Sequence, residues 1–166
     1  MNVLTRVFKA ALDEANKPES YVKGDEFERF VMERLFPREE YNLLHKTHDY
    51  SSNRDNFIAS SKLPDFKFVS VANRLQFYVE AKFRSKYHNG VLEWCKPFQL
   101  KRYRDINNIV PVLIVVGLGG KPGRPEQVFL IPMQHIQFVK LFPSFLKRYE
   151  IPVNRCVSES YLTRIM

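Results

Sequence analysis

Hydrophobic residues recur at helical spacing in the first part of the chain. Within residues 2–16 they fall three or four positions apart, which is typical of an amphipathic helix, and this segment ends before Pro18. A second apolar stripe, which includes Phe27 and Leu35, predicts another helix over residues 21–36. The chain is therefore expected to open with two helices.

From residue 41 onward the pattern changes to short β-prone runs that are separated by turn-rich or helical segments. The run IVPVLIVVGLG is apolar on both faces, which predicts a central strand covered by helices on both sides. Before it, a helical pattern from Pro97 to Ile106 predicts a crossover helix. We therefore expect an α/β (or α+β) fold with a mixed central sheet flanked by helices. The predicted strands are 41–48, 66–72, 75–83, 109–117 and 127–132.

The chain of 166 residues is long enough for one hydrophobic core and too short for two comfortable ones. Its C-terminal part carries a helical pattern over 133–149, interrupted near Pro143, and the last fifteen residues have no clear pattern. We therefore expect a single domain. It would comprise residues 1–166, with a core over about 21–132, an N-terminal helix over 1–16 and a helical addition over 133–166.

The composition favours a polyanionic partner, because 26 Lys and Arg residues outnumber 18 Asp and Glu residues and the pI is near 9.5. The two cysteines lack the spacing of a zinc or iron–sulfur site and fit a reducing compartment. The N-terminus lacks a signal-peptide core, no apolar run approaches membrane-spanning length, and neither predicted helix is strongly cationic on one face. We expect a cytoplasmic protein that binds nucleic acid and no membrane.

Residues 75–83 alternate between apolar and polar side chains, so Glu80 and Lys82 project from the same face of the predicted strand. A two-residue turn at Asn73 and Arg74 would place Asp65, on the preceding strand, opposite Lys82. In that register Asp65, Glu80 and Lys82 share one surface.

Two carboxylates at short range repel each other unless a cation lies between them. Oxygen ligands with incomplete protein coordination suit Mg²⁺ or Mn²⁺. The sequence therefore predicts a metal site at Asp65 and Glu80. Lys82 would orient a water nucleophile, assist its deprotonation, or offset charge on a phosphate. The alternative for Glu80 and Lys82 is an exposed, salt-bridged strand face.

The sequence Pro64-Asp65, followed by Glu80-Ala81-Lys82, resembles the signature of the PD-(D/E)XK nuclease superfamily. The resemblance implies a restriction-endonuclease-like core and Mg²⁺-dependent hydrolysis of DNA. It also implies that Asp65 and Glu80 bind the metal and that Lys82 acts at the nucleophilic water.

Two further segments resemble elements of this superfamily. Gly24, Phe27 and Glu28 match its first helix, in which a glutamate points at the metal site, so the resemblance implies that Glu28 is a third metal ligand. Gln99 and Tyr103 lie on one helix face and resemble the Q-x-x-x-Y element of the RecB-type branch, which lies over the active site and contacts DNA.

Together these residues indicate a metal-dependent DNA nuclease with Mg²⁺ or Mn²⁺ as its cofactor. Small members of the superfamily often act as dimers, so a homodimer is possible. The alternative is a catalytically inactive nuclease-fold module that binds nucleic acid or a protein partner. The implied catalytic residues are Glu28, Asp65, Glu80, Lys82, Gln99 and Tyr103, and the candidate nucleic-acid-binding residues are Arg84, Lys86, Lys101, Arg102 and Arg104.

Three other patterns are assigned structural roles. His45 and His48 would point to opposite faces of a strand, so they do not predict a shared zinc site. Residues 117–125 fit no phosphate-loop motif and predict a Gly/Pro turn between strands. The polar interval 49–63 predicts a surface loop.

Overall fold

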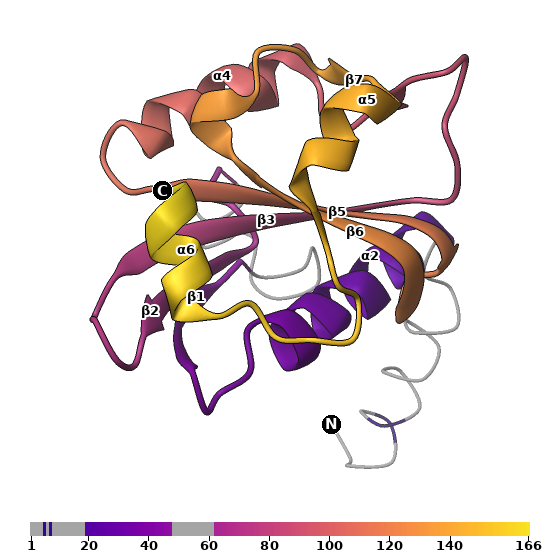
Figure 1. The fold of residues 1–166 in the computed structure, drawn as a ribbon. Helices are drawn as coiled ribbons and strands as arrows, with labels where there is room; N and C mark the ends of the chain where they lie inside the picture. Colours follow the sequence, from indigo (N-terminus) through magenta and orange to yellow (C-terminus); the bar gives the residue numbers. More distant parts are fainter. Residues whose placement is uncertain (1–4, 6, 8–18, 48–61) are drawn as a thin grey trace.

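One six-stranded sheet, with the strand order β1-β2-β3-β5-β6-β8, runs through the computed structural model of the chain (Figure 1). Strands β3 and β5 are parallel and the other neighbouring pairs are antiparallel. The structure describes residues 5, 7, 19–47 and 62–166. The six strands are β1 (Tyr41–Lys46), β2 (Phe66–Ser70), β3 (Gln76–Arg84), β5 (Val112–Lys121), β6 (Arg124–Pro132) and β8 (Glu150–Ile151).

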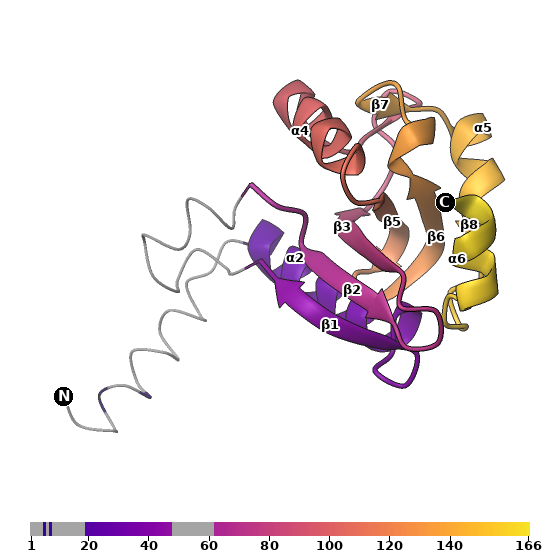
Figure 2. The ribbon, with the colours of Figure 1, turned by 90° about the vertical axis from the view of Figure 1, so that its left-hand side faces the viewer.

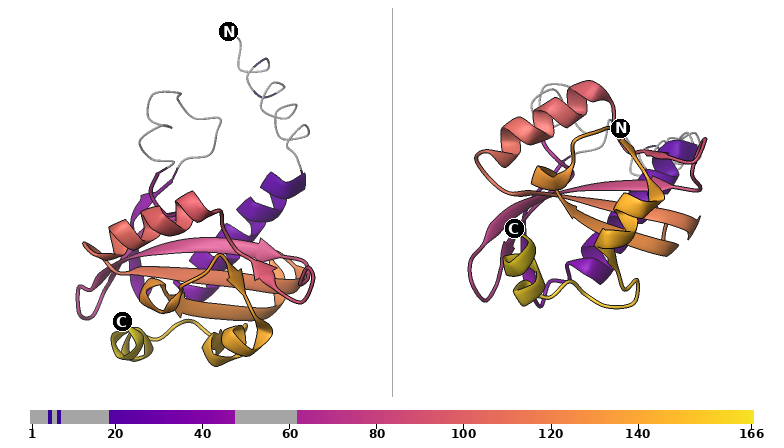
Figure 3. Two further views of the ribbon diagram at one scale, coloured as in Figure 1. Left: turned by 90° about the horizontal axis from the view of Figure 1, so that it is seen from above. Right: turned by 45° about the horizontal axis from the view of Figure 1, so that its top comes forward.

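Helices cover both faces of this sheet, and the views in Figures 2 and 3 separate the two layers. One face carries α2 (Glu19–Phe30), its π-helical continuation η1 (Val31–Leu35) and α6 (Glu159–Ile165). The other carries α4 (Pro97–Asn107), α5 (Pro143–Leu146), the 3₁₀ turns η2 (Met133–His135) and η3 (Lys147–Tyr149), and a ribbon of β4 (Leu92–Glu93) and β7 (Lys140–Leu141). The predicted mixed sheet flanked by helices is confirmed.

Strand β5 separates two hydrophobic clusters. Leu113 and Val115 face the cluster under α2, whereas Val112, Ile114 and Val116 face the cluster under α4. All five are buried, because the strand has apolar side chains on both faces and neighbouring strands on both edges. The central strand that the apolar run predicted is therefore present.

A close contact fixes α2 against the sheet. The Phe27 ring lies where a Cβ on Gly117 of β5 would collide with it, and it packs 5.8 Å from the rings of Phe30 and Phe83. Only glycine admits this approach. As a result, Glu28, the next residue of α2, lies near the C-terminal end of β3.

The predicted pairing of β2 with β3 is wrong by two residues. Phe66 pairs with Val79 and Phe68 with Phe77, whereas a two-residue turn would have placed Phe66 opposite Ala81. Because side chains alternate with a period of two, this shift leaves every side chain on its predicted face.

The cause of the shift is a longer turn. The carbonyl of Leu75 accepts a hydrogen bond from the Ser70 amide at 2.9 Å, so the residues between them form the loop. Arg74 adopts a positive φ of 62°, and the Asn73 side chain accepts a hydrogen bond from the Leu75 amide at 2.9 Å. Asn and similar short polar residues make such local bonds readily.

The predicted helix over 133–149 is also wrong. This segment forms η2, β7, α5 and η3 in turn, and β7 pairs with β4, about fifty residues earlier, through Leu92 and Leu141. Pro143 begins α5, because a proline has no amide hydrogen to donate inside a helix. The partner strand lies too far away in sequence for a local pattern to reveal it.

The C-terminal segment, which the sequence assigned to an addition outside the core, closes the edge of the α2 cluster. The Tyr41 hydroxyl donates to the Val157 carbonyl at 2.6 Å, and the Val157 amide donates to the Leu35 carbonyl at 2.9 Å. Leu162 of α6 is fully buried in the same cluster. Residues 150–166 therefore contribute to the core.

Element boundaries differ elsewhere by a few residues. The helix expected over 21–36 becomes π-helical at Val31, β5 begins at Val112, and β6 begins at Arg124. The turn within 117–125 consists only of Pro122 and Gly123, because Lys121 and Arg124 still pair.

Three predicted features lie wholly or mostly outside the described residues. They are the helix over 2–16, His48 and the loop over 49–63. Within the described part of the chain, no helix combines the length and the apolar character that crossing a bilayer requires.

Candidate active site

An open cavity of about 360 Å³ lies where the first turns of α2 meet the C-terminal end of β3. Its lining includes Lys23, Gly24 and Glu28 from α2, Asp65 just before β2, and Lys82 and Arg84 from β3. The cavity therefore gathers residues from three segments that are far apart in the sequence.

Asp65, just before β2, lines this cavity, and Glu80 of β3 is buried next to it. Continuing the pairing of Phe66 with Val79 by one step places Asp65 opposite Glu80, and the Asp65 carboxylate accepts a hydrogen bond from the Ala81 amide at 2.8 Å. Burial, together with the nearby charges of Glu80 and Glu28, raises the pKa of Asp65 well above its usual value. The Lys82 ammonium and the Ala81 amide offset only part of this effect.

Lys82 is the cation between these acids. Its ammonium lies 2.5 Å from the Glu80 carboxylate, which is 2% exposed. Burial by itself lowers the pKa of Lys82, but the charges of Glu80 and Asp65 outweigh burial, so the pKa is raised. Lys82 therefore remains protonated at neutral pH and acts as a hydrogen-bond donor.

Glu28 reaches this group of charges from α2. Its carboxylate lies 3.5 Å from the Lys46 ammonium, and its charge contributes to the raised pKa of Asp65. The sequence analysis missed Lys46. Lys46 is opposite Phe66, the residue after Asp65, so a known pairing of β1 with β2 would have revealed it.

Of the two predicted residues of α4, the structure brings only Tyr103 to the carboxylates. Tyr103 is buried and its side chain hydrogen-bonds Glu80. Burial, followed by the charges of Glu80 and Asp65, raises the pKa of Tyr103, so its hydroxyl stays protonated and donates to Glu80. The Gln99 side chain accepts a hydrogen bond from the Lys96 amide at 2.9 Å and thereby caps the start of α4.

Arg84 joins the cavity to the β4–α4 segment. Its guanidinium donates to the carbonyls of Glu93 and Trp94, at 2.9 and 3.1 Å. Burial lowers the pKa of Arg84 from its usual value, although arginine remains charged at any physiological pH. The side chain is therefore a fixed positive charge on the rim of the cavity.

Of the other four candidate nucleic-acid-binding residues, Lys86 lies in the loop after β3 and three lie on α4. Lys86 and Lys101 are exposed, and the Arg102 guanidinium lies over an aromatic ring. Arg104 donates a hydrogen bond to the Gln137 carbonyl at 2.8 Å and so holds the segment that precedes β7.

No three acidic, histidine or cysteine side chains among residues 19–47 and 62–166 converge as a complete set of metal ligands. Glu80 is paired with Lys82, and Glu28 is paired with Lys46. Each of these carboxylates therefore has an ammonium group beside it.

Comparisons with known proteins show a likeness in structure. No family model matches the chain, and no curated protein matches it. The solved structure of Hjc, a Holliday junction resolvase from the archaeal hyperthermophile Archaeoglobus fulgidus, matches with a TM-score of 0.51 and 14% sequence identity. The match covers 76% of this chain and 88% of that one.

At 14% identity, the likeness to the resolvase concerns the fold alone. The chain therefore has a restriction-endonuclease-like fold, in which helices flank a mixed sheet.

Proposed function

We propose that this protein is a divalent-metal-dependent DNA nuclease of the PD-(D/E)XK type. The observation that carries the proposal is the meeting of Asp65 and Lys82 at one cavity of a restriction-endonuclease-like fold, with the buried Glu80 carboxylate 2.5 Å from the Lys82 ammonium. Glu28 borders the same cavity. The net basic charge of the chain suits a substrate with a phosphate backbone.

The residues at the cavity fit a hard divalent cation such as Mg²⁺ or Mn²⁺. Asp65 and Glu80 offer oxygen donors, and the pKa of Asp65 is raised first by burial and then by the charges of Glu80 and Glu28, which Lys82 only partly offsets. Mg²⁺ usually binds through one or two carboxylates together with waters and substrate phosphates, so it does not require a complete protein cage. Asp65 and Glu80, with Glu28 beside them, would hold the ion. When bound, it would supply an activated water and charge neutralisation at phosphate.

The protein side chains would contribute position and charge. Lys82, which remains protonated, would donate to a phosphate oxygen or orient the attacking water, and it is unsuited to act as a general base at neutral pH. Tyr103 would hold the Glu80 carboxylate in place through its hydrogen bond. Arg84, already fixed by two carbonyls, would bind a neighbouring phosphate.

A cleavage assay with Mg²⁺ or Mn²⁺ tests this proposal. The substrates are supercoiled plasmid, linear duplex and a synthetic four-way junction, the last because the structural match is a Holliday junction resolvase. Cleavage should be lost in Asp65→Ala and Lys82→Ala and retained in Asp105→Ala and Lys147→Ala, which change exposed residues away from the cavity. Activity that persists in the first two variants would exclude the proposed roles.

A catalytically inactive module that binds nucleic acid is the second candidate function. Two observations favour it. The Glu80 carboxylate is already bound by Lys82 and Tyr103. Among the described residues, no complete set of metal ligands converges. DNA binding with a steep salt dependence, but no cleavage with any divalent metal, would favour this candidate. The homodimer stays a prediction that light scattering can measure.

A further inference from the structure

Two exposed phenylalanines flank the short strand β7, one on either side of its lysine. Phe138 and Phe142 are 68% and 62% exposed, and Lys140 between them is also exposed, whereas Val139 and Leu141 face the protein. Exposure therefore alternates over these five residues, so that a ring, an ammonium group and a second ring are all open to solvent. We name Phe138, Lys140 and Phe142 the β7 stripe.

Positive charge surrounds the stripe. Lys140 lies opposite Glu93 of β4, and the Lys96 ammonium lies 2.9 Å from the Glu93 carboxylate, so one acid has two lysines near it. In the first turn of α4, Phe98 is 68% exposed and the Arg102 guanidinium lies 5.7 Å from its ring. The surface therefore combines aromatic faces with a net positive charge.

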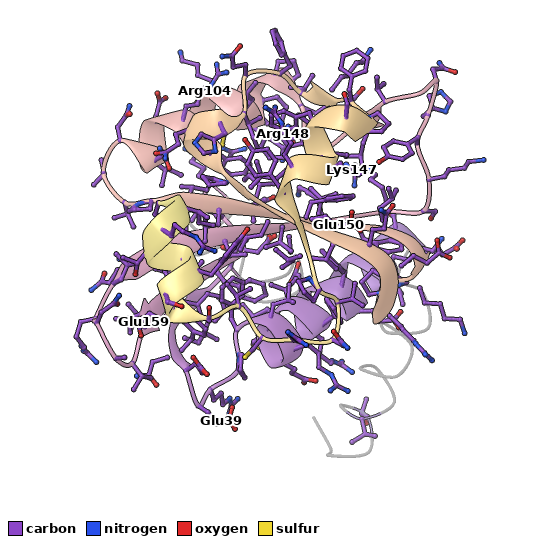
Figure 4. All side chains as sticks on the ribbon, viewed as in Figure 1. Glu39, Arg104, Lys147, Arg148, Glu150 and Glu159 are labelled. Carbon is purple, nitrogen blue, oxygen red and sulfur yellow. The ribbon has the colours of Figure 1, made fainter. Side chains whose placement is uncertain are left out.

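Further charged residues lie on this side of the sheet. Figure 4 shows Arg104, Lys147 and Arg148 on the α4 and α5 side, where β7 also lies, with Glu150 close to Lys147, whereas Glu39 and Glu159 lie on the opposite side.

Hydrogen bonds connect the stripe rigidly to the cavity. The Arg84 guanidinium, which lines the cavity, donates to the Trp94 carbonyl, and the Trp94 indole in turn donates to the Phe138 carbonyl at 3.1 Å. The Trp94 amide also donates to the Val139 carbonyl, at 3.0 Å. The stripe therefore has a fixed position relative to Arg84 and the cavity.

We propose that the β7 stripe, with Phe98, binds unpaired nucleotides, and that the substrate is DNA with a single-stranded segment beside the cleaved bond. This inference rests on the proposed nuclease function for its cleaved bond. Bases stack on the exposed rings of Phe138 and Phe142, and Lys140 contacts a phosphate between them. A duplex keeps its bases stacked on each other, so it cannot use these rings, whereas a flap, fork or frayed end can.

The lysine within the stripe separates this proposal from a protein interface. Lysine is depleted in the cores of protein–protein interfaces, and here an exposed Lys140 lies between the two rings, with Lys96 nearby. Alternating aromatic and cationic side chains are instead the composition of surfaces that bind single-stranded nucleic acid.

Binding of labelled oligothymidine of about 20 nucleotides, measured by fluorescence anisotropy in EDTA, tests the stripe without cleavage. Phe138→Ala and Phe142→Ala should each weaken binding about 5- to 100-fold, and Phe142→Trp should retain it. Ile109→Ala removes an apolar side chain that is 86% exposed beyond the end of α4, and it should leave the affinity unchanged. Lys140→Ala should lower the slope of affinity against salt, whereas the phenylalanine variants should not.

The outcomes are distinct. Oligothymidine affinity that is unchanged in the double variant Phe138→Ala/Phe142→Ala overturns the inference. If that variant also converts a dimer to a monomer in light scattering, the stripe binds a second copy of the chain. A protein that binds oligothymidine through the stripe but cleaves no DNA with any metal would refute the proposed nuclease function and leave the stripe as a binding site. In an active enzyme, the double variant should slow cleavage of a flap substrate and spare a blunt duplex.

Discussion

The two ends of the β2–β3 strand pair differ in the surroundings of their polar side chains. At the end near the turn, Ser70 is fully buried and its hydroxyl donates to the Glu159 carboxylate at 2.8 Å, and nearby Tyr41 donates to a carbonyl of the C-terminal segment. At the other end, Asp65 and Glu80 face each other beside an open cavity. We call these the closed end and the open end.

The difference lies in how completely each polar group is satisfied. The closed end matches each donor to one acceptor, so its polar groups cost little to bury. The open end buries Asp65 near two other acids, Glu80 and Glu28, and the pKa of Asp65 is raised by burial and by these neighbours. Such an arrangement lowers stability and is characteristic of a functional site.

The largest expected effect is on cleavage, and it should be confined to the open end. Lys82→Ala should slow cleavage about 10²- to 10³-fold, because it removes a charge that stabilises the transition state. Ser70→Ala changes the closed end and should leave the cleavage rate per folded molecule unchanged. Single-turnover assays with saturating enzyme measure both variants, and equal losses in both would contradict a difference in role.

A divalent cation should stabilise the open end. At a concentration about 100 times its Kd, Mn²⁺ should raise the free energy of unfolding by about 2.7 kcal/mol. Thermal unfolding with Mn²⁺ and with EDTA measures this, independently of activity. The increase should disappear in Asp65→Asn and persist in Glu159→Gln, which changes an acid at the closed end. An increase of the same size in both variants would indicate a metal bound elsewhere.

Loss of a buried hydrogen bond should destabilise the closed end. Tyr41→Phe leaves the Val157 carbonyl without its 2.6 Å partner and should cost about 1–2 kcal/mol in urea unfolding, with an unchanged m-value. Tyr161→Phe, in the half-buried α6, is the matched control and should change stability by less than about 0.5 kcal/mol. If Tyr41→Phe is as stable as the wild type, the C-terminal segment does not close this end as described.

The smallest effect should be a gain in stability at the open end. The pKa of Asp65 is raised in the folded state, so the unfolded state loses its proton first as pH rises above 3.8. Without metal, the wild type should therefore lose stability from that pH upward, until the folded state also loses its proton. Asp65→Asn should avoid this loss.

The melting temperatures of the wild type and Asp65→Asn, measured in EDTA, check this sign. The variant should melt higher at neutral pH, by about 2–4 °C for each kcal/mol of repulsion removed. The two proteins should converge at pH values below 3.8, where Asp65 is protonated in both states. A variant that is less stable at neutral pH would show that the Ala81 hydrogen bond outweighs the repulsion.

The fold was predictable where a local pattern carries long-range information. The apolar run of β5 shows on its own that both faces are covered, and the alternation of β3 assigns Glu80 and Lys82 to one face. The π-helical end of α2 and the short elements of residues 133–151 were not predictable in this way. Their hydrogen bonds join segments whose partners are far away in sequence.

The sequence predicted which residues lie at the candidate site better than it predicted how they are arranged there. Asp65, Lys82 and Glu28 line one cavity and Glu80 is buried against Lys82, although the roles of all four stay predictions. The pairing partner of Asp65 was wrong, because the turn after Ser70 is longer than two residues. Gln99 was expected beside Tyr103 at the site, but its side chain accepts a hydrogen bond from the Lys96 amide and caps α4 instead.

The sequence by itself determined which side chains share a face, since a strand repeats every two residues and a helix about every three and a half, whatever the strands pair with. The tertiary structure decided which of those side chains meet. Only strand pairing places Asp65 opposite Glu80, and only the packing of α2 against β5 brings Glu28 to the same cavity. Periodicity is a property of the local backbone, whereas register and packing depend on the lengths of turns and on contacts between distant segments.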